Sequence, residues 1–293
     1  LVSIAGTADT ITARNFFFDH DPGNRYNTLQ EIRFADGSSW DIASMLKEQG
    51  LRGSDGSDNV QGSHWSDLMR GLGGDDYLNG HGSDDRLFGD SGNDQLWGED
   101  GADQLDGGTG NDTVYGQAGA DVIEGGKGDD VLFGGSGDDV VVFGRGDGQD
   151  VIGAESPDWW ESSLGHNVLM FKADIAATDV SLTRIGDDLL VSIAGTADTI
   201  TARNFFFTHD PGNRFNTLQE IRFADGSSWD IASMLSGSGL VGTSKLESLG
   251  APNRPNSAGG SGGDDLKPCA WNDSLIGGSQ DGLDCGEFKK DSL

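Results

Sequence analysis

The 293 residues include 49 Asp and Glu against 19 Lys and Arg, so the formal net charge is −30. So acidic a chain repels nucleic acid and anionic membranes and favours cations as partners. With 48 glycines and only 34% hydrophobic residues, the chain is too lean for an ordinary globular core of this length, which leaves disorder or thin repeated layers. No hydrophobic run reaches the length of a membrane span.

A β-rich segment at residues 1–46 recurs, almost unchanged, at residues 190–235. We call these the first and second module copies. Their offset of 189 residues predicts a tandem array. Because Leu1 falls inside a predicted strand, without Met or a signal peptide, we expect the chain to belong to a longer protein. The copies differ only in Asp19 against Thr208 and in Tyr26 against Phe215.

Ten consecutive nonapeptides fill residues 53–142. Position one is always Gly, and position four is Gly in eight repeats, with Trp65 and Ser83 as exceptions. These glycines predict a tight turn with positive φ. Position eight is always aliphatic or Met, which predicts a three-residue strand that must stack on copies of itself. Position six is always Asp: Asp58, Asp67, Asp76, Asp85, Asp94, Asp103, Asp112, Asp121, Asp130 and Asp139.

This pattern resembles the haemolysin-type calcium-binding nonapeptide, G-G-x-G-x-D-x-U-x, of the RTX family of secreted bacterial proteins. The resemblance implies an all-β fold: a right-handed parallel β-roll with two nonapeptides per turn, flanked by β-rich capping modules. Residues eighteen apart would then lie above one another. The position-eight side chains would form two interior ladders, Val60, Leu78, Leu96, Val114 and Leu132 on one side, and Met69, Leu87, Leu105, Ile123 and Val141 on the other.

Stacking would also place the position-six carboxylates in two columns, with neighbours about one strand spacing apart. Two unit charges at roughly 5 Å repel by about 0.8 kcal/mol in water and about 3 kcal/mol at an effective dielectric constant of 20. The tract holds 20 acidic residues and three basic ones, Arg70, Arg86 and Lys127. A bound hard cation is therefore needed to neutralise the columns.

Carboxylates and the carbonyls of glycine turns form all-oxygen sites, which prefer Ca²⁺ to softer metals and to Mg²⁺. We expect the tract to bind several Ca²⁺ ions. Folding should then depend on calcium. Turn formation alone would not keep Asp in one column ten times. The predicted metal ligands are Asp58, Asp76, Asp85, Asp94, Asp103, Asp112, Asp121, Asp130 and Asp139, with Gly71, Gly80, Gly89, Gly98, Gly107, Gly116, Gly125 and Gly134.

The first coil, residues 53–70, is predicted to be a degenerate cap, because His64 and Trp65 stand where the loop needs small residues. His64 as a transition-metal ligand is the alternative, but no second His or Cys lies at ligand spacing. At position five, Asp129 and Asp138 occupy a column that elsewhere also holds Ser, Asn or Ala. We expect these two carboxylates to tune charge rather than to bind the ion.

Beyond the repeats, residues 179–206 predict a hairpin followed by a third strand, and residues 218–235 predict a second hairpin around Asp225 and Gly226 and a helical turn. With Phe223 to Gly226 (FADG) and Trp229, this resembles the module beside RTX repeats in large haemolysin-like and adhesin-like proteins. Such a module would cap or join successive rolls, and the first copy lacks its opening strand. The predicted domains are 1–52 (truncated module), 53–152 (ten nonapeptides and an end loop), 153–235 (module), 236–263 (linker) and 264–293 (C-terminal segment).

Only two cysteines occur, and no disulfide framework can hold the main body. Cys269 and Cys285 are spaced to close a small loop in an oxidising compartment. The segment that carries these cysteines, residues 264–293, does not continue the repeat pattern of the roll.

Several short motifs allow a catalytic or adhesive interpretation beside a structural one. The bonds Asp21-Pro22 and Asp210-Pro211 match the cleavage point of a calcium-triggered self-cleaving module, but Pro-Gly is also a favoured turn. Residues 145–147 read Arg-Gly-Asp, yet they follow the last nonapeptide, where a loop should end the roll. Residues 259–263 match G-x-S-x-G but have linker composition. We favour the structural interpretation in each case and predict no enzyme activity.

We therefore expect a calcium-binding, calcium-folded segment of a large RTX toxin or adhesin, secreted or at the cell surface. The resemblance implies the type I secretion apparatus as a partner in transit. A host or bacterial cell surface is a further possible partner, and neither nucleic acid nor a membrane span is expected. The alternative is an RTX enzyme, such as a protease, lipase or self-cleaving protein, whose catalytic residues lie elsewhere.

Overall fold

The computed structural model describes most of the repeat tract and of the second module copy. It describes residues 31–41, 44, 50–153, 165–206 and 217–235 with their side chains, and elsewhere the backbone at 236–237 and in short strands. Those strands are β1 (Val2–Ser3), β2 (Thr10–Ile11), β23 (Leu240–Val241), β24 (Ser248–Ala251), β25 (Ser257–Ala258), β26 (Asp265–Pro268), β27 (Leu275–Ile276) and β28 (Gly282–Leu283).

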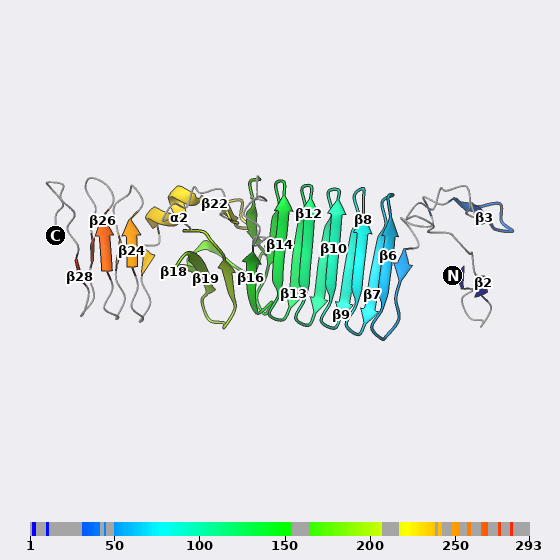
Figure 1. Ribbon diagram of the computed structural model, residues 1–293, viewed down its shortest axis with the longest axis horizontal. Coiled ribbons are helices and arrows are strands. Elements are labelled where there is room, and N and C mark those ends of the chain that lie inside the picture. Colours follow the sequence, from blue (N-terminus) through cyan, green and yellow to red (C-terminus); the bar gives the residue numbers. More distant parts are fainter. Residues whose placement is uncertain are drawn as a thin grey trace.

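The repeat tract forms two parallel sheets that face each other, and successive strands alternate between them (Figure 1). It is a parallel β-roll of about six turns. One sheet holds β6 (Asn59–Ser63), β8 (Tyr77–His81), β10 (Gln95–Asp100), β12 (Thr113–Ala118), β14 (Val131–Ser136) and β16 (Gln149–Gly153). The other holds β5 (Leu51–Arg52), β7 (Leu68–Gly73), β9 (Arg86–Ser91), β11 (Gln104–Thr109), β13 (Val122–Lys127), β15 (Val140–Phe143) and β17 (Val168–Phe171).

The predicted register of eighteen residues is confirmed. Leu78 pairs with Leu96 in one sheet, and Leu87 pairs with Leu105 in the other. Along the strands β9 to β11 the position-eight side chain is buried while both flanking side chains are half-buried or exposed. The core is therefore one aliphatic residue wide on each side, as the sequence predicts.

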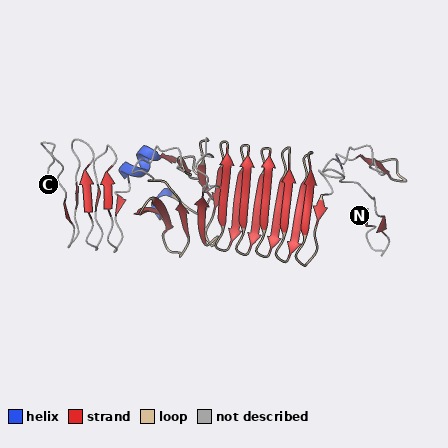
Figure 2. Ribbon diagram, in the orientation of Figure 1, coloured by secondary structure: helices blue, strands red, loops and turns tan. Residues whose placement is uncertain are grey.

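The second module copy continues both sheets of the roll. Residues 177–237, which contain this copy, form η3 (Ala177–Asp179), β18 (Val180–Ile185), β19 (Asp188–Ile193), β20 (Thr199–Ala202), β21 (Glu220–Arg222), β22 (Ser228–Asp230) and α2 (Ile231–Gly237). Strands β18, β19 and β20 form an antiparallel meander, and β20 pairs in parallel with β16. Strand β21 pairs in parallel with β17 and forms a hairpin with β22. The hairpins, the third strand and the helical turn follow the sequence prediction, and Figure 2 shows how little helix accompanies the strands.

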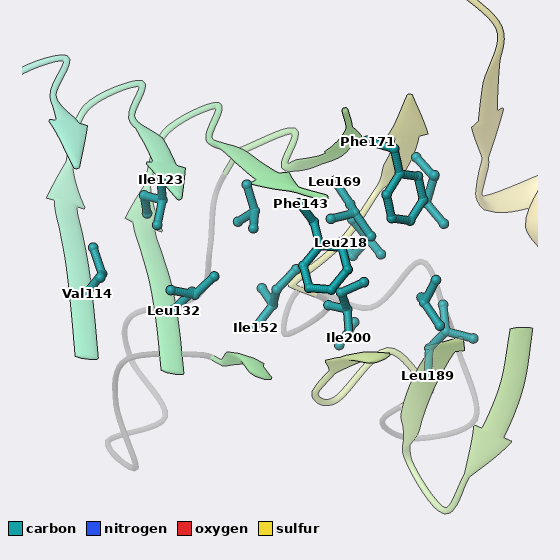
Figure 3. Packing of buried hydrophobic residues seen from close by; sticks show 14 of the residues in the cluster. Val114, Ile123, Leu132, Phe143, Ile152, Leu169, Phe171, Leu189, Ile200 and Leu218 are labelled. Carbon is teal, nitrogen blue, oxygen red and sulfur yellow. The ribbon is translucent and has the colours of Figure 1, made fainter. Parts of the chain in front are cut away.

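A cluster of phenylalanines fills the end of the apolar channel between the two sheets (Figure 3). The rings of Phe143 and Phe171 meet edge to face with centroids 6.3 Å apart, and Phe171 lies 5.5 Å from Phe223 of the module. Phe205 and Phe206 are also fully buried. Aromatic side chains thus close the roll where the aliphatic ladders end, as expected for a module that caps it.

The first module copy repeats the same local pairings. Strands β3 (Glu31–Arg33) and β4 (Ser39–Asp41) form a hairpin whose register equals that of β21 and β22 after a shift of 189 residues. Strands β1 and β2 likewise reproduce the pairing of β19 with β20. Over the described strands, the same sequence therefore gives the same strand pairing in both copies.

Residues 236–263, a predicted linker, contain the strands β23, β24 and β25. Strand β23 pairs in parallel with β18, and β25 and β27 follow it in the same sheet. Backbone hydrogen bonds to the edge strand of the module explain how a segment with few hydrophobic residues can form strands. In the part of the chain that the structure describes, no helix is long and apolar enough to cross a bilayer.

Candidate metal centre

Burial separates the two acidic columns of the repeats. From the second repeat onward every position-six aspartate is at most 3% exposed, whereas Asp58 in the first repeat is half-buried. The position-five acids Asp75, Asp84, Asp129 and Asp138 are all exposed. Buried carboxylates need a compensating partner, so the position-six column is where a ligand must be sought.

From Asp76 onward, one oxygen of each position-six carboxylate accepts a hydrogen bond from a backbone amide of the preceding coil. The backbone amide of Asp94 donates to Oδ1 of Asp112 at 2.8 Å, and the amide of Asp112 donates to Oδ1 of Asp130 at 2.8 Å. The same bond recurs at every step of the column from Asp58 to Asp139, at 2.7 to 3.1 Å. Oδ1 is therefore committed to the fold.

The other oxygen, Oδ2, is buried and has no hydrogen-bond partner in seven of the last eight repeats. A buried acceptor without a partner is rare in folded proteins and costs about 1–3 kcal/mol, more when it is charged. Its regular recurrence indicates a site for a cation rather than an error of packing. The seven residues are Asp76, Asp85, Asp94, Asp103, Asp112, Asp130 and Asp139.

The position-one glycines leave space where Oδ2 lies. A Cβ on Gly89 would overlap both Oδ2 of Asp94 and the carbonyl oxygen of Gly107 in the next coil. The position-one glycines from Gly71 to Gly116 repeat this arrangement, and Gly125 and Gly134 face Oδ2 of their own aspartates in the same way. Carboxylate and glycine carbonyl oxygens thus converge on one small space, which brings the predicted Asp and Gly ligands together.

Burial raises the pKa of these carboxyl groups in the metal-free roll, and loss of hydration is the largest cause. The hydrogen bond from a backbone amide to Oδ1 lowers each pKa. Neighbouring carboxylates raise the pKa, but by less than the loss of hydration does. Mutual repulsion, the cause named from the sequence, is therefore the lesser one. The pKa is raised to about 6 for Asp94, Asp103, Asp130 and Asp139, to about 7 for Asp112 and to about 9 for Asp85.

The first coil differs in its backbone. In repeats three to ten, position two has positive φ, between 68° and 104°. In the first two repeats position two is Ser54 or Ser63, neither of which has positive φ. The amide and hydroxyl of Ser63 both donate to Oδ2 of Asp67, and Ser54 does the same to Asp58. The protein itself satisfies these two oxygens, which supports the interpretation of residues 53–70 as a cap and weakens Asp58 as a ligand.

The donor set fits a hard cation such as Ca²⁺. In the ranges that the structure describes, no three side chains of His, Cys, Asp or Glu converge on one point. A metal ion here would therefore take most of its ligands from backbone carbonyls, with one carboxylate oxygen from each nearby coil. All-oxygen sets of this kind suit Ca²⁺, which accepts many ligands in a flexible geometry.

Position five forms a second ladder that runs in the opposite direction. The amide of Asn111 donates to Oδ1 of Asn93 at 2.8 Å, and the amide of Asp129 donates to Oδ1 of Asn111 at 2.9 Å. An amide side chain serves as well as a carboxylate in this role. Asp129 and Asp138 therefore join neighbouring surface loops through hydrogen bonds. This role comes in addition to the effect on charge predicted from the sequence.

Two further members of the position-six column, Asp150 and Asn167, lie beyond the ten nonapeptides and were not predicted from the sequence. The amide of Asp130 donates to Oδ1 of Asp150, and the amide of Asp139 donates to Oδ1 of Asn167. Asp150 is buried and its pKa is raised to about 8, again chiefly by desolvation. Inserted residues break the nine-residue period before both positions, but the Asp-x-aliphatic spacing of Asp150 and Ile152 was a usable signal.

The Arg-Gly-Asp tripeptide is tied into the end of the roll. Arg145 donates to the carbonyls of Asp174 and Ala194 and pairs with Asp179 at 2.7 Å. Asp147 is buried, with Oδ2 2.6 Å from the amide of Gly144. These contacts support the structural interpretation of residues 145–147.

Stacking brings His81 close to His64, with ring centroids 6.3 Å apart. Spacing along the chain did not reveal this pair, because the two residues lie in neighbouring coils. Nε2 of His81 lies 3.1 Å from Oε1 of Gln61. The pair falls short of a three-ligand cluster among the described residues.

Other predictions lie outside the described residues. These are the Asp-Pro bonds at 21–22 and 210–211, the G-x-S-x-G match at 259–263, and the pairing of Cys269 with Cys285.

Comparison with known families agrees with this geometry. The sequence model of the RTX calcium-binding nonapeptide repeat matches residues 52–83, 66–96, 79–114, 97–130 and 115–150. The model of the haemolysin-type calcium binding protein related domain matches residues 1–44 and 188–233. No curated protein matches the chain.

Among solved structures, the chain is similar to the extracellular lipase LipA from Serratia marcescens. The identity is 17% and the TM-score 0.24, over 54% of this chain and 38% of the lipase. The chain thus spans less than half of the lipase's length. From its repeats, its two related domains and its stacked Asp and Gly loops, the chain belongs to the RTX haemolysin-type family, and its repeat tract is a calcium-binding β-roll.

Proposed function

We propose that this chain is a calcium-dependent folding segment of a large secreted RTX protein, a toxin or an adhesin. The observation that carries the proposal is the column of seven buried Oδ2 atoms without hydrogen-bond partners. A chain with so many desolvated carboxylates is unstable without cations and stable with them. Ion binding and folding are then one equilibrium.

Ca²⁺ would be held by Oδ2 of Asp76, Asp85, Asp94, Asp103, Asp112, Asp121, Asp130 and Asp139, together with carbonyls of the glycine loops. The ion would supply the positive charge that the three basic residues of the tract cannot. The chain's own part is to fix Oδ1 through an amide of the preceding coil and to keep Cβ atoms out of the site. Asp150 is a further ligand candidate because it continues the column.

The consequence for secretion follows from where calcium is scarce and where it is abundant. In a cytosol poor in Ca²⁺ the chain would stay unfolded and could pass through a type I channel. Outside the cell, millimolar Ca²⁺ would fold it, oppose its return and build a rigid spacer. The net charge of −30 keeps the unfolded chain extended and soluble.

The proposal gives this chain a binding role without catalysis, in an extracellular setting. Equilibrium dialysis against Ca²⁺ and Mg²⁺ at pH 7.5, followed by metal analysis, tests it. Several Ca²⁺ ions per chain, little Mg²⁺ and protection from proteolysis only with Ca²⁺ are expected. No bound Ca²⁺ would overturn the proposal, and calcium-dependent cleavage at Asp21-Pro22 or Asp210-Pro211 would point to a self-cleaving protein instead.

A further inference from the structure

The two module copies contain the same hairpin with the same internal contacts. Phe34 meets Trp40 edge to face with ring centroids 4.7 Å apart, and Phe223 meets Trp229 at 5.0 Å. The amide of Phe34 donates to the carbonyl of Ser38 at 2.9 Å, and the amide of Phe223 makes the equivalent bond at 2.9 Å. The hairpin is therefore set by its own sequence.

The surroundings of the two hairpins differ. In the second copy, β21 pairs with β17, Ile221 is 0% exposed and Phe223 is 4% exposed against Phe171. In the first copy, Phe34 is 38% exposed, and β3 and β4 form a two-stranded sheet among the described strands. The same side chain is thus a core residue in one copy and a surface residue in the other.

The other half of the module repeats this contrast. Strand β20 pairs with β19 on one edge and with β16 on the other. Its counterpart β2 pairs with β1, and among the described strands this sheet has two members. Among the described strands, the first copy therefore leaves unpaired two strand edges and one apolar face that the second copy uses against the roll. Exposed edges and faces of this kind are binding surfaces.

We propose that the first module copy docks onto the last coil of a preceding β-roll of the same kind. Two parallel edges must be covered at once, in two facing sheets, as β16 and β17 do for the second copy. One coil of a roll supplies both strands, whereas a single extended peptide supplies only one. The inward side chains would be those of Ile152, Leu169 and Phe171 or their equivalents, which bury Ile221 and Phe223.

The position of the next strand supports a tandem array with a period of 189 residues. After the first copy, β5 (Leu51–Arg52) opens the roll by pairing with β7. After the second copy, β23 (Leu240–Val241) lies at the same offset and opens another run of parallel strands, β23, β25 and β27. Each copy would thus close one roll and precede the next.

Hydrogen exchange in saturating Ca²⁺ tests the proposal on the chain itself and on a tandem chain. The tandem chain joins residue 189 to Leu1 of a second full chain, so that the inner first copy follows a complete roll. In the single chain, amides of β3 should exchange at least about a hundredfold faster than those of β21. In the tandem chain, the inner β3 should become as slow as β21. Equal exchange of β3 and β21 in the single chain, or an inner β3 that stays fast, would overturn the proposal.

A matched substitution separates docking from local folding. Phe34→Ala should leave the unfolding midpoint of the single chain unchanged, whereas Phe223→Ala should lower it. In the tandem chain the inner Phe34→Ala should lower the midpoint as well, and Phe34→Leu should restore most of the loss. If Phe34→Ala in the inner copy leaves the unfolding midpoint of the tandem chain unchanged, the first copy does not dock.

The inference rests on calcium-folded rolls, and the same exchange data distinguish the two claims. If β9 to β14 gain no protection when Ca²⁺ is added, the proposed function fails. If they gain protection while the inner β3 stays fast, only the docking proposal fails.

Discussion

The backbone amide of Asp94 donates a 2.8 Å hydrogen bond to Oδ1 of Asp112, eighteen residues further along the chain. This bond divides the work of one carboxylate, because Oδ1 joins two coils and Oδ2 is left facing the glycine of its own loop. An aspartate in this column therefore belongs both to the fold and to the ion site. Substitutions that keep one role and remove the other can separate the two.

Asp130→Asn keeps an oxygen that can accept the amide of Asp112 but removes the charge. We expect Ca²⁺-dependent folding to weaken by about tenfold or more, which corresponds to about 1.4 kcal/mol. In chelator the variant should be no less folded than the wild type, since a desolvated carboxylate is gone. Asp129→Asn is the control, because that exposed side chain can still accept the amide of Gln149. Calcium titrations followed by circular dichroism compare them, and equal effects would contradict this assignment.

Without metal, the roll should be most stable in acid. Six carboxyl groups of the column have a folded-state pKa of about 6 to 9, against about 3.9 for Asp in an unfolded chain. The folded state therefore binds more protons between the unfolded and the folded pKa, so stability falls as the pH rises from about 4 to about 9. Metal-depleted protein should show more β-signal at pH 5 than at pH 8.5. With Ca²⁺ the order should reverse, because the ion displaces protons.

Gly107→Ala should block a site through contact alone, because the added Cβ would overlap Oδ2 of Asp112 and the carbonyl of Gly125. Overpacking of this kind costs about 1–3 kcal/mol. Gly56→Ala, in the first coil, meets only Oγ of Ser54 at 4.0 Å, and a free surface position changes stability by about 0.5 kcal/mol or less. Thermal unfolding in millimolar Ca²⁺ distinguishes the two variants. A Gly107→Ala variant as stable as Gly56→Ala would contradict an ion site beside the position-one glycine.

Gln117→Gly should stabilise the calcium-bound roll. Gln117 occupies position two with φ of 76°, where a residue with a side chain loses about 1–2 kcal/mol relative to its favoured conformation. Glycine relieves that strain, although its unfolded entropy offsets part of the gain. Gln95→Gly, within strand β10, should destabilise instead by about 0.5–1 kcal/mol. Unfolding midpoints of the two variants should therefore move in opposite directions.

Much of this arrangement is readable from the repeat period. Because residues nine apart alternate between sheets and residues eighteen apart stack, the columns of Leu96 and Asp94 follow directly from the sequence. Stacking also explains the paired carboxylates, of which Asp130 is buried and Asp129 exposed.

The remaining features depend on conformation or on breaks in the period. Asp150 and Asn167 were missed because insertions shift the frame, although the backbone bonds continue across them. The left-handed backbone at position two was not evident because five of its eight residues carry side chains, among them Leu72 and Gln117. The use of Ser54 and Ser63 as internal partners could not be foreseen, since it needs the opposite backbone conformation at the same column.

The most direct test is a far-ultraviolet circular dichroism titration of the full chain at pH 7.5, from excess chelator to millimolar Ca²⁺, with Mg²⁺ as the control. We expect a largely unfolded spectrum in chelator, a cooperative rise of β-signal with Ca²⁺ and little response to Mg²⁺. A β-spectrum of the same size in chelator and in millimolar Ca²⁺ would contradict it.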